Sequence, residues 1–118
     1  DAALKGRGEI AELLIARGAD VNARNATGAT PLHDAALAGS REVAAVLIAH
    51  GADVNARDAE SGATPLHNAA SWGRTDVVRL LIEKGADRAI RNKAGHTALQ
   101  MAQQNSQPEV VDLLKAQP

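Results

Sequence analysis

Histidines and glycines are the residues of this chain whose types and spacing first suggest chemistry. His33 and His67 each follow Thr-Pro-Leu, and the chain has four histidines in all. No two histidines have the H-x-x-x-H spacing, and cysteine is absent, so the sequence does not offer the ligands of a zinc site. Residues 6–11 fit the letters of a dinucleotide-binding G-x-G-x-x-A turn, but Gly6 aligns with glycines that follow helices, so the required preceding strand is missing. The sequence therefore predicts no catalytic, metal or cofactor site.

The composition predicts a helical protein. The 118 residues suffice for one domain, and 45% of them are hydrophobic, yet Phe and Tyr are absent and there is one Trp. A core of Leu, Val, Ile and much Ala suits closely packed helices better than a sheet sandwich, so we expect an all-α fold.

Charge and hydropathy narrow the classes of partner. The formal net charge is −1, which argues against a nucleic-acid partner, because such binders carry clustered positive charge to neutralise phosphates. No run of about 18 apolar residues is present, so we expect no membrane partner. The absence of cysteine favours the cytoplasm, while a secreted form whose signal was removed stays open.

The elements that position these residues are repeated. Thr30-Pro31-Leu32-His33 recurs at residues 64–67 and, degraded, at 97–100. The Gly-Ala-Asp-Val-Asn-Ala-Arg stretch of residues 18–24 recurs at 51–57 and, altered, at 85–91. The period is 33 residues with one extra residue between Asp58 and Gly62. Internal repetition at this spacing indicates a stacked repeat architecture.

Each repeat predicts two helices and a loop. Thr30 is a good N-cap, Pro31 fits the first helical position and Gly39 suits a C-terminal stop; Thr64 to Gly73 has the same pattern. A second helix follows, with apolar residues at i, i+3 and i+4, and ends before a glycine. This stripe comprises Ile10, Leu13, Leu14; Val43, Val46, Leu47; Val77, Leu80, Leu81; and Val110, Leu113, Leu114.

These repeats resemble the ankyrin repeat family. The resemblance rests on the TPLH starts, on the Ala-Ala-x-x-Gly stretches at residues 35–39 and 69–73, and on the GADVNAR stretches. It implies a solenoid of stacked antiparallel helix pairs, with β-hairpin-like loops projecting at one edge and a concave face. It also implies that each TPLH histidine hydrogen-bonds with its threonine to fix the helix start.

One domain covering 1–118 is expected, in four units. Residues 1–24 are a truncated first repeat, 25–57 and 58–91 are complete repeats, and 92–118 form a C-terminal capping repeat. Gln103, Gln104 and Lys115 replace Ala70, Ser71 and Ile82 of the preceding repeat, as a polar outer face requires. The third hairpin has an irregular stretch at residues 88–90.

The resemblance places partner binding on hairpin tips and on the exposed side of each first helix. The matching positions include Arg24, Thr27, Leu37, Arg57, Glu60, Ser71, Trp72, Arg91, Lys93, His96, Gln104 and Asn105. Trp72 stands where other repeats have Ala38 and Asn105; it is either an interface anchor or a cover for a neighbouring helix. The matching arginines of the three hairpins form an arginine row (Arg24, Arg57 and Arg91) that either steers an acidic partner segment or is simply solvated.

The function predicted from the sequence is noncatalytic protein–protein interaction by a short ankyrin scaffold. The expected partner is a protein, and the chain is expected to be a monomer. The alternative is a structural spacer, or a trimmed or engineered scaffold with no partner of its own.

Overall fold

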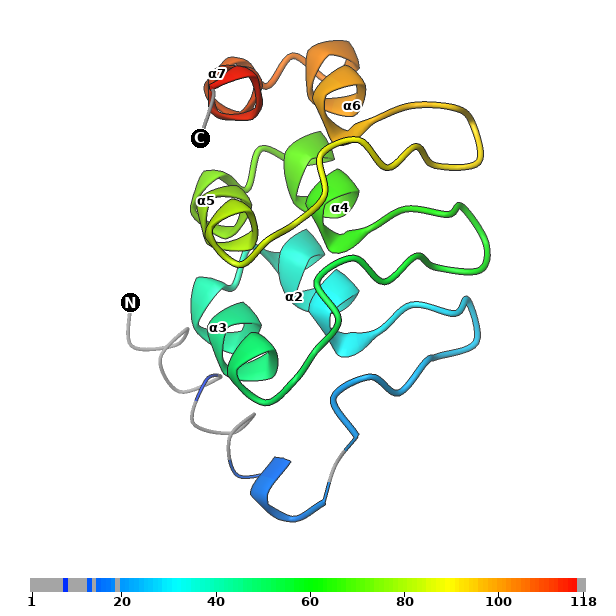
Figure 1. The fold of residues 1–118 in the computed structure, drawn as a ribbon, viewed down its shortest axis with the longest axis vertical. Helices are drawn as coiled ribbons and strands as arrows, with labels where there is room; N and C mark the ends of the chain where they lie inside the picture. The colour runs from blue at the N-terminus through cyan, green and yellow to red at the C-terminus, as the bar shows by residue number, and fades with distance from the viewer. Residues whose placement is uncertain (1–7, 9–12, 14, 19, 117–118) are drawn as a thin grey trace.

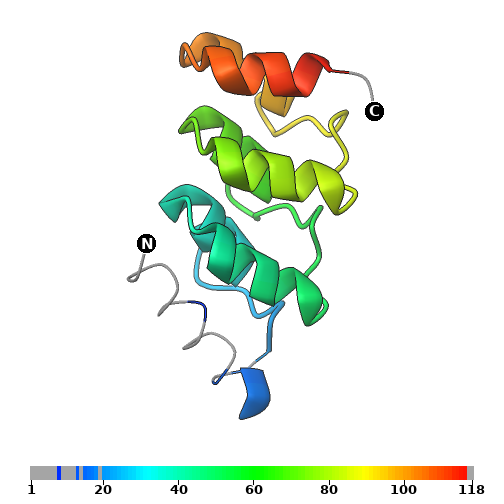
Figure 2. The ribbon, with the colours of Figure 1, turned by 90° about the vertical axis from the view of Figure 1, so that its left-hand side faces the viewer.

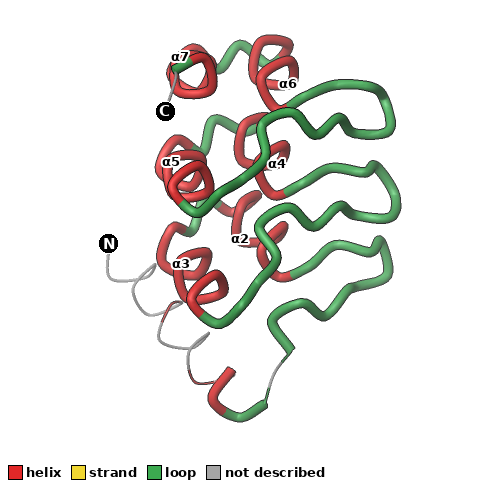
Figure 3. Tube along the Cα trace, in the orientation of Figure 1, coloured by secondary structure: helices red, strands yellow, loops and turns green. Residues whose placement is uncertain are grey.

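Six helices of at least seven residues form two columns in the computed structural model, which describes residues 8, 13, 15–18 and 20–116 (Figure 1). The inner helices are α2 (Pro31–Ala38), α4 (Pro65–Ser71) and α6 (Ala98–Gln104). The outer helices are α3 (Arg41–Ala49), α5 (Thr75–Glu83) and α7 (Pro108–Lys115). Long loops project beyond the inner helices, and no strand occurs in the described residues (Figure 3). The all-α expectation is confirmed.

The inner helices begin where the sequence predicts. Thr30, Thr64 and Thr97 are N-caps in extended conformation, and proline follows the first two at the first helical position. Helix α2 ends at Gly39, which adopts the left-handed conformation with φ 74°. The chain then turns sharply, so each outer helix folds back against its inner partner (Figure 2).

Small side chains make the core between the two columns. Ala36, Ala69, Ala70 and Ala102 are completely buried, which lets neighbouring inner helices pack closely. The predicted stripe holds for α5, where Val77, Leu80 and Leu81 are all buried. Two fully buried residues lie outside the stripe, Ala44 and Val78. Each outer helix packs against one or two neighbouring outer helices as well as against its inner partner, so its buried face is wider than one stripe.

The N-terminal unit is only partly described. Leu13 is helical but half exposed, unlike its counterparts in later repeats. Ile10, Leu14 and most of residues 6–11 lie outside the described residues.

Candidate protein-binding surface

The TPLH histidines hold the fold together. In α2 the Thr30 N–H donates to His33 Nδ1 over 3.0 Å, so the proton of the neutral ring lies on Nε2, which donates to the Ala63 carbonyl over 2.8 Å. His67 repeats this arrangement, with Thr64 at Nδ1 and the His96 carbonyl 2.8 Å from Nε2. Each ring thus caps its own helix and ties it to the next hairpin. The threonine–histidine hydrogen bond implied by the family resemblance is confirmed.

Burial lowers the pKa of His67, because removal from water disfavours the charged ring. The hydrogen bond to the His96 carbonyl raises the pKa, Arg57 lowers it, and Asp58 raises it, but the net direction is down. The neutral ring is also the form that the hydrogen bonds require, since Nδ1 accepts from the Thr64 N–H.

The arginine row links successive hairpins. We call residues 24–30, 57–64 and 91–97 the first, second and third hairpins. Arg24 donates through one nitrogen to the Gly28 carbonyl of its own hairpin (2.7 Å) and to the Arg57 carbonyl of the next (2.8 Å). Arg57 likewise donates to its own Gly62 carbonyl (3.2 Å) and to the Arg91 carbonyl (2.9 Å). These two guanidinium groups therefore bind backbone as well as facing solvent, a role that the sequence reasoning missed.

Asparagine side chains make a second link between repeats. The Asp53 N–H donates to Asn22 Oδ1, and the Asp87 N–H donates to Asn55 Oδ1, each over 2.8 Å. The third repeat has Ala89 at this position, so the link stops there. Asp53 and Asp87 each accept from the backbone N–H two residues on, which closes the turn before each hairpin.

The hairpin tips also meet one another through the backbone. The Ala59 N–H donates to the Thr27 carbonyl (3.2 Å), and the Lys93 N–H donates to the Ser61 carbonyl (2.9 Å). Thr27, Ser61 and Lys93 are exposed beside these bonds. The extra residue of the second hairpin lengthens its tip, where Glu60 is exposed.

Asp58 closes the second hairpin. Its carboxylate accepts from the backbone N–H and the hydroxyl of Ser61 and from the Gly62 N–H. Partial burial raises the pKa of Asp58, but the hydrogen bonds from Ser61 and Gly62 more than offset this effect, so the net pKa is lowered.

Two large apolar side chains are exposed at the C-terminal ends of neighbouring inner helices. Trp72, the residue that ends α4, is 63% exposed, and Leu37 in α2 is 41% exposed. Gln104, the last residue of α6, and Asn105, its C-cap, are exposed. Ser71 is half-buried, and its carbonyl accepts from the Asn105 side chain (3.3 Å). The structure thus exposes Trp72 and does not use it to cover a neighbouring helix.

His96 lies between the hairpin tips and the inner helices. It is half-buried, its carbonyl accepts from His67, and its ring nitrogen Nε2 is 3.4 Å from the Gln104 side-chain nitrogen. Of the twelve residues predicted to bind a partner, ten are exposed, while Ser71 and His96 are half-buried.

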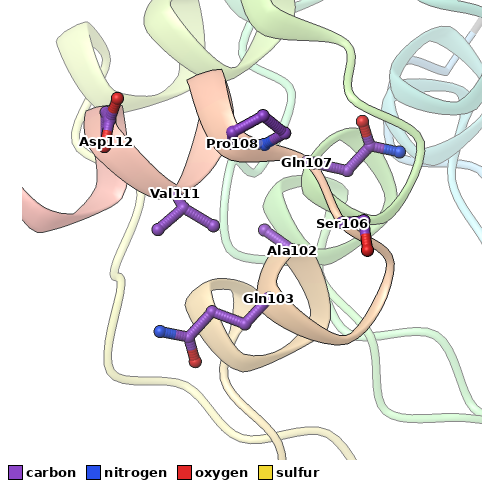
Figure 4. A pocket seen from close by; sticks show the side chains of 7 residues that line it. All are labelled: Ala102, Gln103, Ser106, Gln107, Pro108, Val111 and Asp112. Carbon is purple, nitrogen blue, oxygen red and sulfur yellow. The ribbon is translucent and has the colours of Figure 1, made fainter.

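The C-terminal repeat has an open outer side. A hollow of about 500 Å³ lies between α6 and α7, lined by Ala102, Gln103, Ser106, Gln107, Pro108, Val111 and Asp112 (Figure 4). In the preceding repeat the matching residues Ala69, Ala70 and Val78 are fully buried, and α6 and α7 pack on the helices that carry them. Gln103, Gln104 and Lys115 are exposed. Arg88, in the irregular stretch, donates to the Leu114 and Ala116 carbonyls and so caps the end of α7.

Among the residues that the structure describes, no cluster of His, Asp or Glu could hold a metal ion. Within the same part of the chain, no helix is long and apolar enough to cross a membrane.

The fold and the hydrogen-bonded repeats define a helical-repeat solenoid. The family model described as "Ankyrin repeats (3 copies)" matches residues 1–58 and again 58–117. The chain belongs to the ankyrin repeat family. Comparison with curated proteins finds no match. Ankyrin repeats are generally protein–protein interaction modules and generally noncatalytic.

Proposed function

We propose that this chain is a noncatalytic module that binds a protein through the exposed side of its inner helices and through its hairpin tips. The observation that carries the proposal is the exposure of Trp72. The one Trp of a chain without Phe or Tyr lies at the surface, 63% exposed, while the buried hydrophobic residues of the described part of the chain are Ala, Leu and Val. Tryptophan is enriched among the residues that dominate binding energy at protein interfaces.

The surroundings of Trp72 support an interface. Leu37 adds a second exposed apolar side chain from the neighbouring inner helix, and α2 packs directly on α4. Asn105, exposed at the end of the next inner helix, supplies a polar side chain beside this apolar pair, since it donates to the Ser71 carbonyl. An apolar centre with a polar rim is the usual anatomy of a protein interface.

The backbone at this surface is also held in place before a partner arrives. Arg74 donates to the Leu37 carbonyl (2.9 Å), and Asn105 and Gln107 donate to the Ser71 carbonyl (3.3 Å each). A surface that is already ordered loses less conformational entropy on binding.

The test combines capture and titration. The full chain is immobilised, proteins are captured from lysate of the source organism, and each captured protein is then titrated in purified form against wild type, Trp72→Ala and Arg79→Ala. Arg79 is exposed on the outer helix α5, so its variant is the matched control. Trp72→Ala should weaken binding by about 2 kcal/mol, roughly thirtyfold, while Arg79→Ala binds as wild type does. Equal binding by Trp72→Ala and wild type would refute the proposed surface, and a chain that binds nothing would be a structural spacer.

A further inference from the structure

The third hairpin differs from the other two because none of the described residues stacks on its outer edge. On the first hairpin, a Cβ added at Gly28 would lie 2.5 Å from the Ala59 Cβ. On the second, a Cβ added at Gly62 would lie 3.1 Å from the Lys93 nitrogen. At Gly95, the matching position of the third hairpin, nothing lies within 4 Å. The outer edge of this hairpin is therefore open.

Arg91 is a hydrogen-bond donor at the open edge, and the matching arginines of the other two hairpins show what it can bind. Arg24 and Arg57 each donate to a carbonyl of their own hairpin and to a backbone carbonyl of the next one. Arg91 makes the first of these bonds, to Gly95 over 2.8 Å, and no other with the described residues. Its remaining N–H groups have no protein acceptor in this part of the chain.

The same edge carries a matching acceptor. Thr27 and Ser61, each the residue before the hairpin glycine, accept a backbone N–H from the next hairpin. The third hairpin has Ala94 at this position, and its carbonyl accepts no backbone hydrogen bond from the described residues. The third hairpin thus presents guanidinium N–H groups and a carbonyl that have no partner among the described residues, at positions where the first and second hairpins each bind backbone of the next hairpin.

The charge of the third hairpin favours an acidic partner segment. Residues 91–97 contain Arg91, Lys93 and His96 and no acidic residue, whereas the second hairpin contains Asp58 and Glu60. Arg91 and Lys93 are exposed. Opposite charges in a partner would bring it to this edge and favour its correct orientation.

We propose that the open edge of the third hairpin binds an extended acidic segment of a partner protein by backbone pairing. A carbonyl of the segment accepts from Arg91, an N–H of the segment donates to the Ala94 carbonyl, and acidic side chains face Arg91. The Lys93 ammonium group donates to the Ala59 carbonyl of the second hairpin and adds positive charge nearby. The binding mode is similar to strand addition at a sheet edge, with main-chain hydrogen bonds giving affinity and charge giving selectivity, although the hairpin itself contains no regular strand. The inference rests on the proposed protein-binding function but places this contact away from Trp72.

The probe is a capped octapeptide that alternates glutamate with valine and threonine, and its control replaces each glutamate with lysine. Binding to the full chain is followed by amide chemical shifts, and the single Trp72 indole signal reports on the inner-helix surface. The acidic peptide should shift the amides of residues 91–95 and leave the indole signal unmoved. The lysine peptide should bind at least about tenfold more weakly, since it lacks the charge-assisted contacts.

Backbone pairing is separated from simple charge attraction by two N-methylated versions of the acidic peptide. Successive N–H groups of an extended strand point to opposite sides, so methylating alternate residues removes the donors of one side only. One version should lose binding and the other retain it. Equal behaviour of the two versions would overturn the proposal.

Variants locate the contact on the protein. Arg91→Gln should weaken the acidic peptide about tenfold, because a charge-assisted hydrogen bond is lost, and Arg79→Gln should have no effect. Loss of binding on Trp72→Ala, with shifts around α4, would overturn this inference while supporting the proposed function. Self-association of the chain that Arg91→Gln abolishes would assign the edge to a second copy and would also overturn it.

Discussion

His33 and His67 use both ring nitrogens to build the repeat. Nδ1 accepts from the threonine N–H, and Nε2 donates to a carbonyl about thirty residues away. In the third repeat Gln100 takes only the first of these roles: its side chain accepts from the Thr97 N–H (2.8 Å) and makes no hydrogen bond to another hairpin among the described residues. Glutamine is therefore a natural probe of the histidine sites: it preserves the cap and removes the link.

Replacing His67 with Gln should reduce both stability and its dependence on pH. The variant loses the hydrogen bond to the His96 carbonyl, worth about 1 kcal/mol of unfolding free energy at pH 7.5. Because the native pKa of His67 is lowered, the unfolded chain binds the proton first as pH falls below the ordinary value of 6.5. Wild type should thus lose stability from about pH 6.5 downward, and His67→Gln should lose less.

Urea denaturation at a series of pH values between 7.5 and 5 measures this difference. His50→Gln, at the exposed end of α3, is the control for loss of a histidine outside the TPLH sites. Parallel pH profiles for wild type and His67→Gln would show that protonation of His67 does not limit stability.

Trp72 gives an optical test of its own exposure. The chain has no Tyr, so its fluorescence comes from this one side chain, and a 63% exposed indole should emit at long wavelength in the free protein. Trp72→Ala should change the unfolding free energy by less than about 0.5 kcal/mol, as exposed substitutions do. Short-wavelength emission together with a loss of about 3 kcal/mol is the result for a core aromatic and would contradict the exposed position.

At the scale of elements, the hairpins are part of the stack and not free appendages. Each inner junction carries an arginine-to-carbonyl bond, an asparagine-to-backbone bond and a backbone bond between tips. Their glycines serve two purposes, since they have positive φ and also let the next hairpin approach. In the third hairpin Gly95 also has positive φ, but no described residue lies within 4 Å of a Cβ added there.

Alanine at two equivalent glycines should separate these purposes. Gly28 and Gly95 have φ of 80° and 86°, so either substitution costs about 1–2 kcal/mol from the left-handed backbone. Gly28→Ala also forces its Cβ against the Ala59 backbone nitrogen, 2.7 Å away, which adds about 1–3 kcal/mol of overpacking. Urea midpoints should therefore fall further for Gly28→Ala. Equal losses would mean that the hairpins separate at little cost.

For the whole molecule, stability comes from contacts between neighbouring repeats. Helix α6 packs on α4 and α7 packs on α5, so the last helix pair covers the apolar side of the repeat before it. Such stacks behave as a chain of repeats coupled to their nearest neighbours, and a terminal unit with a polar outer side keeps the stack soluble.

Deleting residues 97–118 should therefore cause aggregation or a large loss of stability. The deletion removes Ala98, Ala102, Val110 and Leu114 from the core and exposes Ala69, Ala70 and Val78. Light scattering and thermal unfolding measure the effect, and Arg88→Gln, which releases only the end of α7, is the milder comparison. A truncated chain that stays monomeric with an unchanged melting temperature would contradict the capping role.

The sequence alone determined the repeat, its helices and the helix starts. Threonine N-caps, proline at the first turn and glycine stops act through bonds between residues a few positions apart, so their spacing can be read along the chain. For His33 and His67, the hydrogen bond with threonine was expected from the family resemblance. The hydrogen bond from Nε2 to a carbonyl of the next hairpin was found only in the structure.

Only the tertiary structure decided what the surface residues do. Arg24, Arg57 and Arg91 occupy matching positions of the repeat, yet two reach the next hairpin, and the third bonds only to its own hairpin among the described residues. Trp72 allowed two interpretations, since a large apolar side chain at a helix end can face water or a neighbouring helix. The physical reason is the same for the arginines and for Trp72. Their roles depend on which groups about 33 residues away lie beside them in the fold, and the residue types along the chain do not specify this.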